Sequence, residues 1–170
     1  MANRGKLLGI GESFEFKLMS IVRSTFPDAI ILHDLRLHSA YLGKTTQIDI
    51  LVITGIGVFC IEAKNWKHWI KGNYDDFNWS GLTNERKTMK VFNTYHQNFI
   101  HIRALRNAMR ISGFEPVQFV NAIVVPDGTE IRSDCKEVIN LSKLPRFMQE
   151  HGVEHIDKFE YRDAVKGVTS

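Results

Sequence analysis

The spacing of apolar residues predicts two principal helices. Apolar residues recur at helical intervals over residues 11–25, and the prediction ends before Pro27. A longer helix is predicted over residues 93–113, with Gly113 at its end. One apolar stripe of this second helix comprises Phe99, Ile102, Leu105 and Met109.

Runs of β-branched and aromatic residues predict the strands. They cover residues 29–35, 47–54, 57–64, 69–71, a short piece near Trp79, most of 117–128, and 137–141, before a helix over 142–151. Residues 43–46 are expected to be loop, and the pieces near Trp69 and Trp79 are expected to lie at the edge of the same sheet. The order predicts an α/β domain with a mixed β-sheet flanked by helices.

The best-defined hairpin lies in the stretch QIDILVITGIGVFCIEAKNW, residues 47–66. A two-residue turn at Gly55 and Ile56, of type II′ with glycine first, would pair Thr54 with Gly57. Paired positions then keep a constant sum, which makes the register of every other pair predictable.

This register places Asp49 opposite Glu62 and Gln47 opposite Lys64. Because strand side chains alternate, both pairs point to the same face of the hairpin. The other face is expected to be core, and it comprises Ile48, Ile50 and Val52 against Phe59, Ile61 and Ala63.

Two carboxylates that face each other destabilise a hairpin unless a cation separates them or one takes a proton. Lys64 would neutralise part of the charge of Asp49 and Glu62, and a divalent cation explains the pair better. Oxygen ligands suit Mg²⁺ or Mn²⁺, and no Cys/His spacing for zinc is evident. The alternative is a solvent-facing salt-bridge cluster.

Composition fits one globular domain of 170 residues, with 44% hydrophobic and 24% charged residues. The net charge of +3 permits an anionic partner without demanding one. Cys60 and Cys135 are expected to be reduced, in a cytoplasmic protein. The sequence has no apolar segment typical of a signal peptide or of a membrane span, so a soluble protein is expected.

The residues of the hairpin carry a resemblance. The motif of the PD-(D/E)XK nuclease superfamily resembles the pattern in this chain, which is Asp49 followed by Glu62 and, after one intervening residue, Lys64. The chain is similar to the nuclease-related domain (NERD) family over about residues 9–125. The similar features are the stretch GIGESFEF, the hairpin, a downstream glycine and tryptophan, and a helix with Gln97. Ile48 replaces the proline of the motif, and the Asn-Pro often found before the glutamine helix is missing.

The resemblance implies a single restriction-endonuclease-like domain over residues 1–170, with the C-terminal strand and helix completing it. It implies a metal-dependent phosphodiester hydrolase that uses Mg²⁺ or, as a substitute, Mn²⁺. The implied metal ligands are Asp49, Glu62, the Ala63 carbonyl and Glu12.

The resemblance also implies that Lys64 would orient the attacking water and stabilise the phosphorane charge. Gln97 would touch water, Lys64 or the substrate phosphate. A surface glutamine is the alternative, and Glu12 could simply favour the dipole of its helix. Polar surface roles are favoured for His96 and His101.

Basic and aromatic residues supply candidate contacts to nucleic acid. Phosphates could be contacted by five basic residues, Lys87, Lys90, Arg103, Arg106 and Arg110. A solvent-exposed charged face explains these residues equally well. Trp66, Trp69 and Trp79 could stack on bases, although core packing is the more common role.

The leading hypothesis is a nuclease that cuts DNA rather than RNA. A binding module that keeps the fold without catalysis is the alternative, and an RNA-processing nuclease is a third reading. A two-fold homodimer is expected by analogy, because two copies can cut both strands of a duplex.

Overall fold

The computed structural model describes residues 10–40, 42–83, 85–152 and 155–170. The helices are α1 (Ile10–Thr25), α2 (Thr94–Ile111), η1 (Leu141–Lys143), α3 (Leu144–His151) and α4 (Lys158–Val168). The strands are β1 (Ile30–Ser39), β2 (Lys44–Thr54), β3 (Gly57–Ala63), β4 (Trp69–Lys71), β5 (Asn78–Leu82), β6 (Thr88–Phe92), β7 (Phe119–Val125), β8 (Glu130–Arg132) and β9 (Val138–Asn140).

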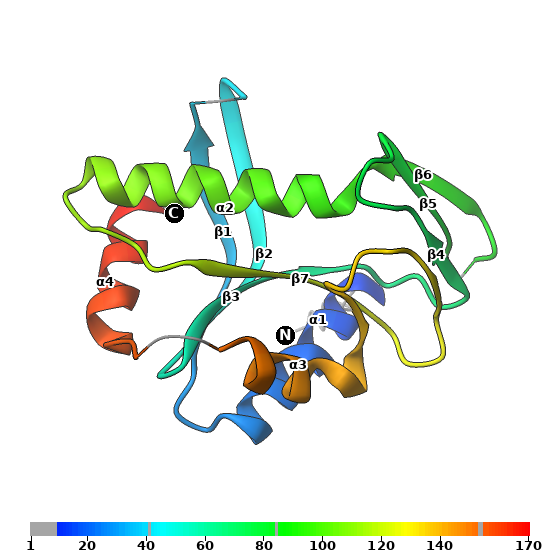
Figure 1. Cartoon of the computed structure of the whole chain (residues 1–170), viewed down its shortest axis with the longest axis horizontal. Helices are drawn as coiled ribbons and strands as arrows, with labels where there is room; N and C mark the ends of the chain where they lie inside the picture. Colours follow the sequence, from blue (N-terminus) through cyan, green and yellow to red (C-terminus); the bar gives the residue numbers. More distant parts are fainter. Residues whose placement is uncertain (1–9, 41, 84, 153–154) are drawn as a thin grey trace, which may run out of the picture.

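The main sheet has five strands in the order β1-β2-β3-β7-β9. Strands β1 to β3 form an antiparallel meander, and β7 and β9 add to it in parallel. Figure 1 shows α2 crossing one face of this sheet, with α1 and α3 on the other. The fold is therefore mixed α/β, with two mixed sheets and flanking helices, as in restriction-endonuclease-like proteins.

Two apolar layers hold the helices to the main sheet. Beneath α1 and α3, buried residues such as Leu18 and Met148 pack on Ile61. On the opposite face, Leu105 of α2 and Val165 of α4 belong to the second layer. The central strands β3 and β7 are covered on both faces, which explains their nearly continuous apolar sequences.

The short strands form a second sheet, which corrects the expectation that they extend the main one. Its order is β6-β5-β4-β8. Trp66 and Trp79 are buried in a separate apolar cluster together with Ile123 and Val138 of the main sheet. The cluster joins the two sheets. The sequence did not predict β6, β8 or α4, because their apolar faces are short.

Helix α2 begins with a side-chain cap and ends at a glycine. The Asn93 side chain accepts a hydrogen bond from the His96 N–H, and Gly113 follows the helix at φ 85°. Ile102 and Met109 of the predicted stripe are buried, whereas Phe99 is exposed. The stripe is thus narrower than predicted, because Phe99 lies on the flank of the helix.

The predicted register of the β2–β3 hairpin is confirmed near the turn, whereas the predicted pairs Asp49–Glu62 and Gln47–Lys64 are absent from the ladder. Thr54 pairs with Gly57, and the ladder continues at a constant sum to Ile50 and Ile61. The turn is not type II′, because Gly55 is not among the glycines with positive φ. Residues 44–46, expected as loop, extend β2.

The ladder between β2 and β3 ends before it reaches Asp49 and Glu62. Beyond this level β2 continues its pairing with β1, while the Lys64 N–H donates to the Val124 carbonyl of β7. The two strands diverge here, and the space between them is available to polar side chains.

The side-chain alternation of β2 breaks at the same level. Ile48 packs in the α2 layer with Leu51, three positions away, so its predicted place beside Ile50 is wrong. Asp34, which would face Asp49 in β1, is missing from the ladder and has a φ of 53°. A local irregularity in both strands therefore turns Ile48 to the opposite face.

Gly81 of the second sheet packs closely against Trp66, and this contact gives a test of the fold. A Cβ on Gly81 would lie 1.9 Å from the Trp66 ring, whereas a Cβ on Gly55 meets nothing within 4 Å. We expect Gly81→Ala to lower the free energy of unfolding by about 2–3 kcal/mol. Gly55→Ala should change it by less than about 0.5 kcal/mol. Equal urea midpoints for the two variants would contradict the packing described here.

Candidate active site

An open cavity of about 800 Å³ lies where β2 and β3 diverge. It is bounded by β2, by the end of β3, by α2 and by Phe92 at the end of β6. Its polar lining includes Gln47, Asp49, Glu62, Lys64, Gln97 and His101. The cavity thus brings together residues that are up to 86 positions apart in the chain, from Glu15 of α1 to His101 of α2.

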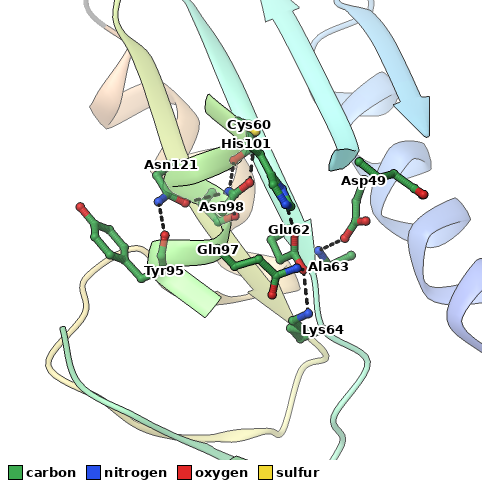
Figure 2. Close-up of polar contacts among 12 residues, drawn as sticks. Asp49, Cys60, Glu62, Ala63, Lys64, Tyr95, Gln97, Asn98, His101 and Asn121 are labelled. Atoms are coloured by element: carbon green, nitrogen blue, oxygen red, sulfur yellow. Dashed lines mark hydrogen bonds and ion pairs between the residues drawn. The ribbon is translucent and has the colours of Figure 1, made fainter. Parts of the chain in front are cut away.

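Glu62 is the most buried charged residue of this cavity, with 2% of its surface exposed. Its Oε1 lies 2.7 Å from Lys64 Nζ and accepts a hydrogen bond from Gln97 Nε2 at 3.3 Å. Figure 2 shows Lys64 and Gln97 approaching this carboxylate from two directions. An ion pair so far from water forms at a high desolvation cost, so it is unlike an ordinary surface salt bridge.

The second oxygen of Glu62 has no hydrogen-bond partner among the described residues. His101 Nδ1 lies 3.8 Å from this oxygen, and it is buried and also has no hydrogen-bond partner among the described residues. Burial, and then the charge of Lys64, lower the pKa of His101 to about 4, so the ring is neutral at pH 7. The surface role expected for His101 is therefore wrong, whereas His96 is exposed.

Asp49 lies on the other side of the cavity from α2 and is partly buried. Its Oδ2 accepts a hydrogen bond from the Ala63 N–H at 3.1 Å. Desolvation first, and then the charge of Glu62, raise the pKa of Asp49 to about 7. The ionised forms of Asp49 and Glu62 therefore repel each other in a partly desolvated site. Gln47 turns away from them and donates to Asp34 Oδ1.

The chemistry of these donors fits a hard divalent cation. The unpartnered Glu62 oxygen and the desolvated Asp49 carboxylate would both gain from a cation, and the Ala63 carbonyl directly follows Glu62 in the chain. Within the described residues, no three His, Cys, Asp or Glu side chains are already gathered as a metal cage. Glu12 lies in the first turn of α1, and its side chain is outside the described part of the structure.

Asn98, which was not predicted from the sequence, fixes α2 over this site. Asn98 is buried, and its Nδ2 donates to the Cys60 carbonyl at 2.9 Å and to Asn121 Oδ1 at 2.8 Å. Its Oδ1 accepts the thiol of Cys60 at 3.2 Å. These bonds anchor α2 to β3 and β7 between Gln97 and His101 (Figure 2). A polar residue on the inward face of an amphipathic helix was the available signal.

The candidate basic contacts are spread over several surfaces. Lys87 pairs with Glu85 at 2.9 Å near the second sheet, and Lys90 is exposed on β6. Arg103 is exposed on α2, whereas Arg106 lines a different cavity, on the side of α2 that faces α3. The structure brings none of these four residues into the lining of the Asp49 cavity.

Two of the three tryptophans and both cysteines are buried. Trp66 and Trp79 are buried and are unavailable for stacking on bases, and Trp69 is partly covered by Arg132. Cys60 and Cys135 are both free and buried. Of the helices in the described part of the chain, none is long and apolar enough to cross a membrane.

Comparison with known proteins places this site in a family context. The family described as "Nuclease-related domain" matches residues 10–126, which include every residue of the cavity. An uncharacterized protein of Bacillus anthracis is 41% identical over 76 residues, which are 44% of this chain and 34% of that protein. The match thus spans about a third of the length of that relative. No solved structure matches the chain.

The raised pKa of Asp49 predicts a stability cost that depends on pH. Because the pKa is higher in the folded state than the ordinary 3.8, ionised Asp49 destabilises the fold as the pH rises from about 4 through 7. At pH 8 in EDTA, we expect Asp49→Asn to be more stable than wild type by at least about 1 kcal/mol. The difference should shrink towards zero near pH 4.

Urea unfolding at both pH values measures this difference. Adding Mg²⁺ at pH 8 should then stabilise the wild type but not the variant, because only the wild type offers the carboxylate. Equal midpoints at pH 8 in EDTA would show that Asp49 is not desolvated as described.

The anchoring role of Asn98 is tested by comparison with Asn107, an exposed asparagine of the same helix. We expect Asn98→Ala to lower the free energy of unfolding by about 2–3 kcal/mol, since it leaves the Cys60 carbonyl without its side-chain donor. Asn107→Ala should stay within about 0.5 kcal/mol. Similar urea midpoints for both variants would remove Asn98 from its structural role.

Proposed function

This chain belongs to the nuclease-related domain family, and we propose that it is a metal-dependent nuclease that hydrolyses phosphodiester bonds of DNA. The observation that supports this most directly is the buried Glu62 carboxylate. One of its oxygens pairs with Lys64, and the other has no partner among the described residues. An anionic oxygen buried in this way costs stability, and a bound cation would recover that cost.

The proposed cation is Mg²⁺, with Mn²⁺ as a substitute. Asp49, Glu62 and the Ala63 carbonyl would hold it, and Glu12 is a further proposed ligand. When bound, such a cation lowers the pKa of a coordinated water and offsets the negative charge of the phosphate. Desolvation and the charge of Glu62 destabilise ionised Asp49, so a cation held between the two carboxylates would favour its charged form.

The protein residues supply orientation and charge. Hydrolysis joins a water oxygen to phosphorus and breaks the bond to one ester oxygen, so negative charge grows on the phosphoryl oxygens. Lys64 carries the positive charge nearest to the two carboxylates and would stabilise that charge. Gln97, which already reaches Glu62, would orient water or a phosphate oxygen at the mouth of the cavity.

Neutral His101 closes the inner side of the cavity beneath α2. Its Nδ1 faces the unpartnered oxygen of Glu62, so the imidazole limits the positions that this carboxylate can adopt. The neutral ring adds no competing positive charge beside Glu62. A binding module without catalysis would have no evident use for two neighbouring carboxylates beside a lysine.

The proposed activity is tested with wild type and three variants of the cavity, Asp49→Asn, Glu62→Gln and Lys64→Met. We expect wild type to cut single-stranded or duplex DNA with Mg²⁺ or Mn²⁺ and to stop in EDTA. Each variant should lose at least about 100-fold of the rate, because each removes a charge at the reacting phosphate. Electrophoresis of end-labelled DNA and RNA measures the products and the preferred substrate.

Asp75→Asn, at an exposed carboxylate outside the cavity lining, is the matched control and should cut at the wild-type rate. Absence of cleavage in the wild type with either metal, or cleavage that survives in Glu62→Gln, would contradict the proposed nuclease. Binding of DNA without cleavage would favour the binding module instead.

A further inference from the structure

Two phenylalanines beside the cavity have side chains that are exposed to solvent. Phe77 is 76% exposed and Phe92 is 40% exposed, and their ring centroids lie 5.5 Å apart in an edge-to-face arrangement. Phe92 lines the same cavity as Asp49 and Glu62. Large aromatic side chains exposed together at the edge of a site indicate a contact surface for a partner or substrate.

The outer face of the second sheet continues from these rings. Ile70, Trp79, Val91 and Ile131 belong to the apolar cluster between the sheets or pack against it, so the residues that alternate with them point outward. Phe92 is one of these outward residues, and it pairs with Asn78 of β5.

Three cations share one row across this outer face. Arg132 of β8 pairs with Lys71 of β4, Lys71 pairs with Ser80 of β5, and Ser80 pairs with Lys90 of β6. With strands about 4.8 Å apart, the row spans roughly 14 Å. Arg132 also bonds to Glu130 at 2.6 Å, which leaves the two lysines as the main positive charges of the row.

We propose that this outer face, with Phe77 and Phe92 at its edge, binds an unpaired DNA strand and leads it into the cavity. The proposal rests on the proposed nuclease function, and it specifies the form of the substrate. The phenyl rings offer stacking surfaces for bases, and Lys71 and Lys90 offer positive charge for the phosphates.

The aromatic rings favour an unpaired strand over a duplex. Inside a duplex both faces of each base are covered by neighbouring bases, so a ring on the protein surface has no base to stack on. An unpaired strand leaves the base faces accessible, and stacking on aromatic side chains then contributes to affinity with little dependence on sequence. Trp69 is less suited to this role, because the Arg132 guanidinium lies 5.3 Å from the centre of its ring.

The test is fluorescence-anisotropy binding in EDTA, where cleavage is absent. The probes are a labelled 15-nucleotide oligothymidine and a 15-base-pair duplex. We expect the double variant Phe77→Ala/Phe92→Ala to bind the oligothymidine about 5-fold to 150-fold more weakly and the duplex within twofold of wild type. Phe92→Tyr, which keeps a stacking ring, should retain wild-type affinity.

Phe159→Ala is the matched control, because Phe159 is an exposed phenylalanine of α4 outside the lining of this cavity. It should leave both affinities unchanged. Lys90→Gln should reduce the salt dependence of oligothymidine binding by about 0.7 in log–log slope.

Unchanged binding of oligothymidine by the double variant, or an equal loss on the duplex, would overturn the single-strand surface. These measurements need no metal and no catalysis, so they separate the two proposals. Loss of single-strand binding in the double variant supports the surface even if the wild type cuts nothing, an outcome that would overturn only the nuclease. Metal-dependent cleavage combined with unchanged binding would overturn only the surface.

Discussion

The burial of the Glu62 carboxylate is the constraint on which the candidate site depends. Glu62 is the last residue but one of β3 in the main sheet, where a charge has almost no access to water. The protein compensates one oxygen with Lys64 and Gln97 and leaves the other oxygen beside a neutral histidine. Because an uncompensated buried charge is costly, this arrangement supports the proposed site for a cation and a phosphate.

The fold creates the space for this carboxylate by ending the ladder between β2 and β3. Asp49 can therefore turn its carboxylate to the Ala63 N–H instead of stacking against Glu62. Helix α2 then closes the other side, held in place by the hydrogen bonds of Asn98. The second sheet, which follows β3 in the chain, brings exposed aromatic rings to the rim of the same cavity.

The register of the hairpin could be predicted from sequence as far as Ile50 and Ile61, because a two-residue turn fixes the pairs next to it. The end of the ladder before Asp49 and Glu62 could not be predicted, because it depends on the strands that flank the hairpin. The reversed side of Ile48 could not be predicted, because it depends on a local irregularity opposite Asp34 that involves a second strand. Nor could the second sheet, since short strands such as β4 carry no information about which sheet they join. The position of His101 depends on the depth of α2 over β3, which the buried Asn98 sets and helical periodicity alone does not.

Measurement of Mn²⁺ binding tests whether the buried Glu62 carboxylate holds a metal ion. Titration of Mn²⁺ followed by electron paramagnetic resonance should show one site per chain in the wild type and loss of that site in Glu62→Gln. Lys64→Met should bind Mn²⁺ at least as well as the wild type, because the Lys64 ammonium no longer occupies Glu62 Oε1. Tight Mn²⁺ binding that survives in Glu62→Gln would contradict the account, since it would place the metal away from the buried carboxylate.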